Sequence, residues 1–285
     1  MNKENAVSRP LALFKLALDT LDRNPVILYP LVILAALQLA ILALLYFANQ
    51  YPLSNFFDPL IARLWSERFL RYPLNLLLLP KLFYYAQAVL YLFCGGFLLA
   101  VAIHIVATVT AGKKISFMSA WQESLPSYIH VVLSSCLSFL LFFFFTGFYN
   151  ALIDCSSLPP WHILVAGDPY IQFFAGIFFT ALLIYMVPII IIEKKKVFSA
   201  FILNFKTLFH SFWFTVLVVF LPASLYFPII MVRTNFERFP NSNAPEIQLI
   251  VLVLGIFLTM FIDGVIATAV TIHYLSKKKG GIRGF

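Results

Sequence analysis

The chain has 285 residues, of which 62% are hydrophobic and 11% are charged. Soluble domains are about 45–50% apolar and about 25% charged, so this composition excludes an ordinary water-soluble fold and indicates a protein whose solvent is lipid. The net charge of +8 does not indicate nucleic-acid binding, because the Lys and Arg residues flank apolar segments and do not gather on one polar face.

Six apolar segments, each long enough to cross a bilayer as a helix, follow one another along the chain. An α-helix needs roughly 20 apolar residues to span about 30 Å of hydrocarbon. The segments are residues 26–48, 83–111, 128–150, 171–192, 212–232 and 248–275. The sequence therefore predicts an all-α, polytopic membrane protein with one membrane domain over residues 1–285 and no soluble domain.

The connections between these segments differ in positive charge. Lys and Arg are frequent before the first segment, between the second and third, between the fourth and fifth, and after the sixth. They are fewer in the other connections, and residues 151–170 contain none. The positive-inside rule then predicts a multi-pass cell-membrane protein with both termini in the cytoplasm.

A short internal repeat with a shift of 80 residues links two cytoplasmic connections: residues 117–121 match residues 197–201, and the same shift carries His130 onto His210. Both copies combine basic residues with apolar residues at helical spacing, and a related stretch opens the chain at residues 11–21. Chance similarity between apolar-rich segments is the alternative explanation.

We therefore expect three units, at about residues 7–111, 113–192 and 194–276, each an amphipathic helix at the cytoplasmic interface followed by a hairpin of two spans. Such a helix buries its apolar face among lipid headgroups, and its Lys side chains contact anionic lipid. Outside, residues 57–72 have a helical pattern, which predicts either an interfacial helix or a lid over a cavity.

Asp263 stands near the centre of the sixth predicted span. An ionisable side chain at that depth costs on the order of 2.5–3.5 kcal/mol on insertion scales, so it faces the bundle interior or water. Thr259 and Ala267 share its helix face. Either this face packs against another helix, with Asp263 protonated or hydrogen-bonded, or it lines a polar path.

Histidines gather toward the cytoplasmic face. His104 lies near that end of the second span, within possible reach of Asp263, while His130 and His210 occupy equivalent positions of the repeat. These histidines could lie at the membrane interface as ordinary surface side chains, form a proton relay or bind a metal ion. None has a His or carboxylate companion four residues away, so the pattern predicts no metal ion.

The stretch MVPIIIIEKKKVFSAFILNFKTLFHSFW, residues 186–213, resembles a loose group of prokaryotic six-span membrane proteins of uncharacterised function. They include the membrane domain attached to some glycerophosphodiester phosphodiesterases. Pro188, Glu193, Ala200 and Asn204 stand where that pattern has them, and LALDTLDRNPVILYPLVIL at the start is also similar. The resemblance implies a six-span fold but no phosphodiesterase activity, because the catalytic domain is absent from this sequence.

No HExxH, GxSxG or Walker A motif is present, and no cofactor is expected. The leading hypothesis is a non-enzymatic membrane scaffold or a lipid- or partner-interacting protein. Its expected partners are membrane lipid, including anionic headgroups at the cytoplasmic face, and a protein partner or second copy, but not nucleic acid. The alternative is a small transporter or permease component with a polar path past Asp263; an intramembrane enzyme ranks third. The candidate intramembrane polar site comprises Asp263, Thr259, His104, His130 and His210.

Overall fold

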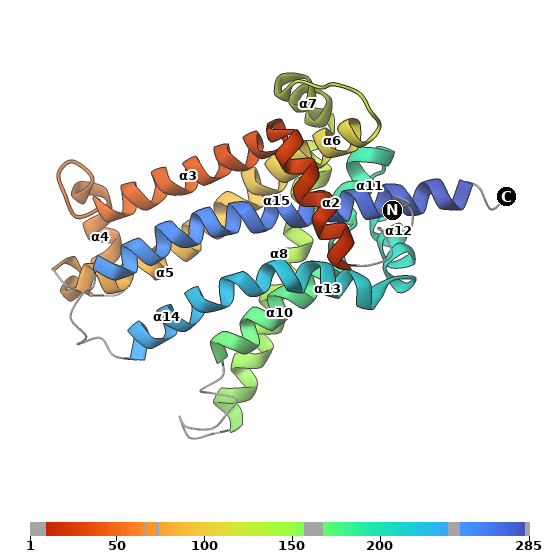
Figure 1. Cartoon of the computed structure of the whole chain (residues 1–285). Helices are drawn as coiled ribbons and strands as arrows, with labels where there is room; N and C mark the ends of the chain where they lie inside the picture. The colour runs from red at the N-terminus through yellow and green to blue at the C-terminus, as the bar shows by residue number, and fades with distance from the viewer. Residues whose placement is uncertain (1–9, 65, 72–73, 157–167, 239–245, 283–285) are drawn as a thin grey trace.

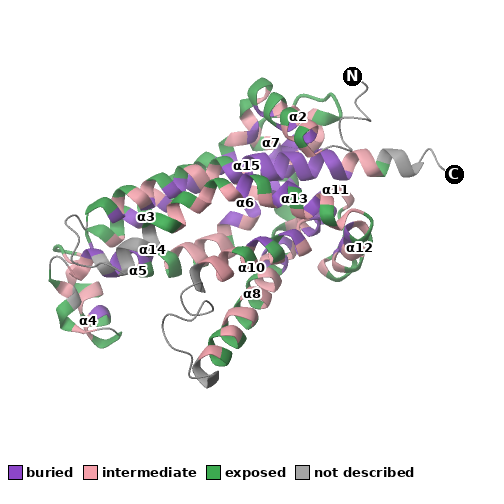
Figure 2. Ribbon diagram, turned by 60° about the horizontal axis from the view of Figure 1, so that its bottom comes forward, coloured by how far each residue is buried: buried purple, intermediate pink, exposed green. Residues whose placement is uncertain are grey.

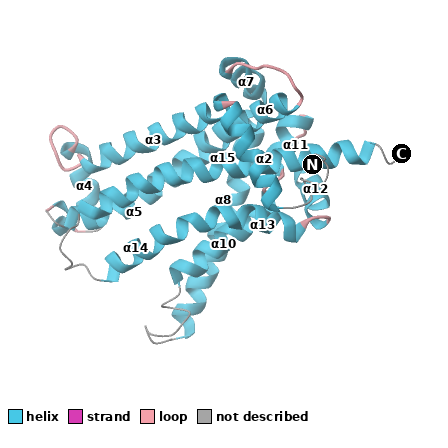
Figure 3. Ribbon diagram, in the orientation of Figure 1, coloured by secondary structure: helices cyan, strands magenta, loops and turns pink. Residues whose placement is uncertain are grey.

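The computed structural model describes residues 10–64, 66–71, 74–156, 168–238 and 246–282, and these residues form helices and no strand (Figure 3). The α-helices are α2 (Pro10–Arg23), α3 (Tyr29–Tyr46), α4 (Ser54–Leu64), α5 (Leu74–Leu90), α6 (Gly96–Thr110), α7 (Phe117–Ser124), α8 (Tyr128–Ser156), α10 (Asp168–Leu183), α11 (Met186–Glu193), α12 (Val197–Phe209), α13 (Phe212–Ala223), α14 (Phe227–Arg238) and α15 (Glu246–Ile282). Short turns join several of them: η1 (Pro25–Leu28), η2 (Glu67–Leu70), η3 (Tyr91–Gly95), η4 (Leu125–Ser127) and η5 (Ser224–Tyr226).

Six helical segments are long and apolar enough to cross a membrane. They are Pro25–Tyr46, Leu74–Thr110, Phe117–Ile153, Tyr170–Glu193, Phe212–Val232 and Glu246–Lys278. The prediction of an all-α chain with six such helices is confirmed. Large apolar side chains cover the outside of these helices, as on α8, where Phe143, Phe144 and Phe148 are exposed, and this is the surface that a lipid solvent requires.

The last helix, α15, occupies the centre of the bundle and contacts α2, α3, α5, α6, α13 and α14. Helix α10 packs against α8 on one side and against α13 on the other, and the C-terminal end of α8 extends away from the bundle, as Figure 1 shows. Helices α2, α7 and α12 lie at one end of the bundle, and α4 lies at the other (Figure 1). The start of the described chain and the end of α15 therefore share one end.

The interior is packed most tightly at the end that holds α2, α11 and α12. The larger core cluster joins these helices to α6, α13 and the C-terminal half of α15, and Figure 2 shows this half as the most continuous buried stretch. A smaller cluster joins α3, α5 and the N-terminal half of α15 through residues such as Leu42, Phe83 and Ile256. Ile266 and Val270 of the larger cluster also line a cavity.

Helices are present at the three places where the repeat predicts them. Their buried residues recur every four positions, which is the spacing of one helix face: Leu13, Ala17 and Leu21 in α2, Ala120 and Ser124 in α7, and Ala200, Asn204 and Leu208 in α12. These helices therefore dock on the bundle with one face. Their place at a membrane surface, and the grouping into three hairpin units, stay predictions.

Candidate functional site: a cavity beside Asp263

A cavity of about 400 Å³ lies between η3, α6, α8, α11 and α15. This volume is within the range of about 300–1,000 Å³ that small-molecule sites occupy. Most of its lining is apolar, and its polar residues are Tyr91, Ser134, Ser135, Ser138, Thr180 and Asp263. Among the described residues, no Lys, Arg or His lines it.

Asp263 and Tyr91 form a hydrogen-bonded pair at the wall of the cavity. The Tyr91 hydroxyl donates to Asp263 Oδ2 over 3.0 Å, and both residues line the cavity. Asp263 is half-buried as a residue and lines the cavity. A carboxyl group at membrane depth is stabilised by such a partner, because lipid offers it no hydrogen bond.

Tyr91 begins η3, a π-helical turn that joins α5 to α6 within the second span. A π turn holds one residue more than an α turn and is frequent at functional sites. A Cβ atom on Gly95 would lie 2.8 Å from Cδ1 of Tyr91, so the ring rests where any larger residue would collide with it. Gly95 thus allows the Tyr91 ring to lie against the helix backbone.

A second polar contact lies one turn before Tyr91 on α5. Gln87 Nε2 donates to Gln38 Oε1 over 3.1 Å, and Gln38, on α3, is 2% exposed. Interhelical amide contacts of this kind hold membrane helices together, with a strength of about 0.6 kcal/mol on average. Polar residues therefore tie α3, α5 and α15 together beside the cavity.

The opposite wall is the polar face of α8. Ser138 Oγ donates to the Ser134 carbonyl over 3.1 Å, and Ser134 Oγ lies 3.8 Å from Sδ of Met186. A Cβ atom on Gly96 would lie 2.3 Å from Ser135 Oγ. Gly96 therefore lets α6 and α8 approach closely, as small residues do in membrane helix pairs.

A break in the fourth span forms another part of the wall. Pro188 has no N–H, and its ring clashes with a carbonyl four residues earlier, so the helix ends at Leu183 and resumes at Met186. Asn204 of α12 bonds both backbone groups near the break: it accepts from the Tyr185 N–H over 3.1 Å and donates to the Leu182 carbonyl over 2.8 Å. Asn204 is 0% exposed, so this amide is a structural part of the bundle.

A polar network continues from the break toward the end of the bundle. The Tyr185 hydroxyl lies 2.8 Å from Thr215 Oγ1, and Lys277 Nζ donates to Ser211 Oγ over 2.7 Å. His273 is stacked on Phe214 with ring centroids 4.5 Å apart, and its ring nitrogens have no hydrogen-bond partner among the described residues. The network connects α11, α13 and α15.

Glu193 ties the end of the fourth span to the central helix. The Tyr274 hydroxyl donates to Glu193 Oε1 over 2.5 Å, and Lys278 Nζ donates to the same oxygen over 3.2 Å. The next residue, Lys194, has a left-handed backbone with φ 51° and ends α11. Lys194 and the two Lys residues after it form the whole connection between α11 and α12.

Of the sequence-predicted candidates, Asp263 lines the cavity. Thr259 lies one turn away, donates to the Gly255 carbonyl of its own helix over 2.8 Å and does not line the cavity. His130 lies in the first turn of α8 with Nδ1 buried and unpartnered among the described residues. His210 is exposed at the end of α12. The histidines are not brought to Asp263.

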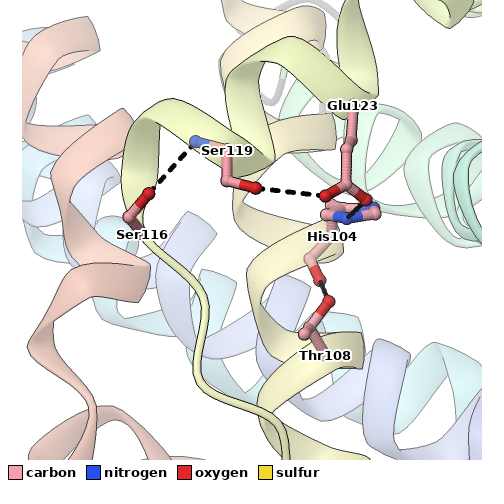
Figure 4. Close-up of polar contacts among 5 residues, drawn as sticks. All are labelled: His104, Thr108, Ser116, Ser119 and Glu123. Carbon is pink, nitrogen blue, oxygen red and sulfur yellow. Dashed lines mark hydrogen bonds and ion pairs between the residues drawn. The ribbon is translucent and has the colours of Figure 1, made fainter.

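His104 binds the surface helix α7. Its Nε2 lies 3.1 Å from Glu123 Oε2, and Ser119 Oγ donates to the other carboxylate oxygen over 3.1 Å (Figure 4). Ser116 caps the helix by accepting from the Ser119 N–H. Trp121 of the same helix lies edge-on to Phe97, with centroids 4.8 Å apart. His104 therefore positions α7 and does not take part in the cavity.

Among the described residues, no group of three or more His, Cys, Asp or Glu side chains is placed to hold a metal ion. The sequence did not predict Tyr91 and the Ser and Thr residues of the cavity, and it assigned no role to Asn204. No known family model, curated protein or solved structure matches this chain. The resemblance of residues 186–213 to other six-span membrane domains therefore stays a prediction.

Proposed function

We propose that the protein is a non-enzymatic membrane protein that binds an amphipathic, lipid-like molecule in the cavity beside Asp263. The observation that carries this proposal is a hydrogen-bonded carboxyl–phenol pair facing an otherwise apolar cavity of about 400 Å³. An apolar cavity accepts hydrocarbon, and a few polar groups within it fix one end of the ligand. The cavity accordingly fits a molecule with an apolar body and one small polar group.

The charges around the cavity limit which kind of polar group the ligand can carry. Phosphate and carboxylate groups are recognised by Arg, Lys or backbone N–H groups at helix N-termini, and no Lys or Arg among the described residues lines this cavity. Asp263 presents carboxyl oxygens, which accept hydrogen bonds. The polar group of the ligand is therefore a donor, either a hydroxyl or an ammonium group.

The ligand enters sideways from the bilayer. Phe139 of α8 and Thr180 of α10 line the cavity and are exposed on the outer surface of the bundle. The cavity is therefore bordered by residues that are open to the surroundings of α8 and α10. An opening between membrane helices gives access to lipid without passage through water.

The membrane orientation and the three units form part of the same proposal. We place the protein in a bacterial inner membrane with both termini cytoplasmic, because the Lys-rich connections and α2, α7 and α12 share one end of the bundle. The units are supported by equivalent burial, since Ala17, Ala120 and Ala200 are each 0% exposed. At that face α2, α7 and α12 would contact anionic headgroups as interfacial helices.

Retained lipid tests the binding function. The wild-type protein, purified in mild detergent, is expected to carry a stoichiometric amphiphile detectable by native mass spectrometry. Asp263→Leu removes the polar anchor and should lose it, whereas Thr259→Val, one turn away on the same helix, should keep it. Equal retention by both variants would contradict the proposal.

A transporter with a path past Asp263 is the second candidate function. The observation that favours it is that two irregular turns, η3 and the break before Met186, form part of the cavity wall. Discontinuous membrane helices form the substrate and ion sites of many transporters. Reconstituted protein that moves a fluorescent alkylamine across vesicles, with the movement abolished in Asp263→Leu, would identify transport; binding without movement would identify a scaffold or carrier.

A further inference from the structure

The residues at the break in the fourth span both face the cavity and contact a surface helix. Leu183, Ile184, Val187 and Pro188 line the cavity. The backbone groups around them, the Leu182 carbonyl and the Tyr185 N–H, are bonded by Asn204. Any displacement of α12 that moves Asn204 therefore removes the partners of these groups and changes this wall.

The connection between α11 and α12 is short. Only Lys194, Lys195 and Lys196 separate the two helices, and Glu193 fixes the end of α11 to α15. With so few residues between them, α12 cannot tilt or shift freely while α11 stays in place. The position of α12 and the geometry of the break are thus linked both through the chain and through Asn204.

The outer face of α12 has the residue pattern of a helix that contacts a negatively charged membrane surface. Phe198, Ile202, Lys206 and Phe209 are exposed and form one stripe at spacings of three and four, opposite the buried Ala200, Asn204 and Leu208. The Lys residues at 194–196 are also exposed, and α12 itself contains no acidic residue. Aromatic side chains with flanking Lys residues are the pattern of a helix that lies in anionic headgroups.

We propose that α12 seats this outer stripe in anionic lipid and that, through Asn204, its seating holds the break in the fourth span in the geometry that forms the cavity wall. The charge of the surrounding leaflet then controls the site. This regulation rests on the proposed function, because it has a role only if the cavity binds a ligand. Its structural part, the link between lipid charge and the break, is measured without any ligand.

Hydrogen exchange of the Tyr185 amide tests the link. The wild-type protein is compared in nanodiscs of phosphatidylcholine and in nanodiscs containing phosphatidylglycerol. Exchange in the peptide covering residues 182–188 should be about three- to tenfold slower in the anionic nanodiscs, the effect of one net hydrogen bond. Equal exchange in both lipids would overturn the proposal, and this arm needs no variant.

Variants separate the lipid contact from the amide contact. Replacing the Lys residues at 194, 195, 196 and 206 by Gln should abolish the difference between lipids. Asn204→Ala should give fast exchange in both lipids, and Asn204→Asp, which keeps the acceptor for the Tyr185 N–H, should restore part of the protection. Thr207→Val is the matched control, because its hydroxyl bonds only to the Leu203 carbonyl of its own helix.

Failure of this link and failure of ligand binding are distinguishable. If hydrogen exchange at the break responds to lipid charge but ligand retention does not depend on Asp263, the link between lipid charge and the break is supported and the binding function is contradicted. If exchange does not respond in the wild type, or Thr207→Val behaves like Asn204→Ala, the link falls whatever the ligand result.

Discussion

The Tyr91 hydroxyl donates a hydrogen bond to Asp263 Oδ2 over 3.0 Å, joining the second span to the sixth although the residues are 172 positions apart. The pair gives the Asp263 carboxyl group a hydrogen-bond partner, and Asp263 also lines a cavity. The sequence left two interpretations of Asp263 open, contact with another helix and a position on a polar path, and the structure has features of both. The residue contacts another helix, and it also lines a space that a ligand can occupy.

The first prediction concerns the coupling between Tyr91 and Asp263. Tyr91→Phe should destabilise the protein by about 0.5–1.5 kcal/mol, because it leaves the carboxyl group without its donor. In an Asp263→Leu background the same change should cost close to nothing. Unfolding in detergent micelles measures this double-mutant cycle. Additive costs would show that the two side chains do not interact.

The second prediction concerns the approach of α6 to α8. Gly96→Ala places a Cβ atom 2.3 Å from Ser135 Oγ, and its next contacts are at 3.5 Å. The substitution should therefore destabilise the protein by about 1–3 kcal/mol, the usual cost of overpacking. Adding Ser135→Ala removes the colliding oxygen and should recover most of the loss in thermal unfolding.

A matched control for this prediction lies on α8 itself. A Cβ atom on Gly147 would meet nothing within 4 Å, so Gly147→Ala should leave the unfolding temperature unchanged or raise it slightly. Because Ala favours the helix more than Gly does, a similar loss at Gly147 would show that the cost at Gly96 does not come from the contact with Ser135.

The third prediction concerns the end of the fourth span. Glu193→Ala removes the acceptor of both Tyr274 and Lys278, so the Lys residues that follow should become more accessible. Tryptic cleavage at residues 194–196 should accelerate several-fold, while global stability falls by less than about 1 kcal/mol because the Lys278 pair is partly exposed. Glu123→Ala, which affects the contact between α7 and His104 of α6, should leave cleavage at this site unchanged.

The fourth prediction concerns membrane orientation. In a protein with its three Cys residues replaced by Ser, one new Cys is placed at Lys195 or at Arg63 of α4. A membrane-impermeant maleimide added to intact cells should label the Cys at position 63 and should label the Cys at position 195 only after permeabilisation. The opposite pattern would reverse the proposed orientation.

The six long apolar helices were predictable because they depend on the length and polarity of contiguous segments, whereas the depth of Asp263 in a membrane stays a prediction. A run of apolar residues must be helical in lipid, whatever surrounds it. The break before Met186 is also a local feature, since the missing N–H of Pro188 acts within its own helix. These features are local, and local features can be read from one sequence.

The cavity and its partners depend on contacts between distant segments. Tyr91 is one aromatic residue among many in an apolar segment, and nothing nearby in the sequence distinguishes it. Asn204 matched the pattern of similar six-span proteins without any assigned role, whereas in the structure it is buried and bonds the broken span. His104 was placed within reach of Asp263 by depth alone, whereas its side chain turns toward Glu123.

The central claim is that the cavity beside Asp263 binds an amphiphile with a hydrogen-bond-donor group. Its most direct test is photolabelling of the membrane-embedded protein with a diazirine-bearing long-chain alkylamine, compared with a carboxylic acid of equal chain length, followed by mapping of the labelled peptides. We predict amine labelling at residues 134–139 and 263–270 that exceeds acid labelling and is lost in Asp263→Leu but not in Thr259→Val. Equal labelling by amine and acid, or labelling confined to the lipid-facing residues 143–148, would contradict the account.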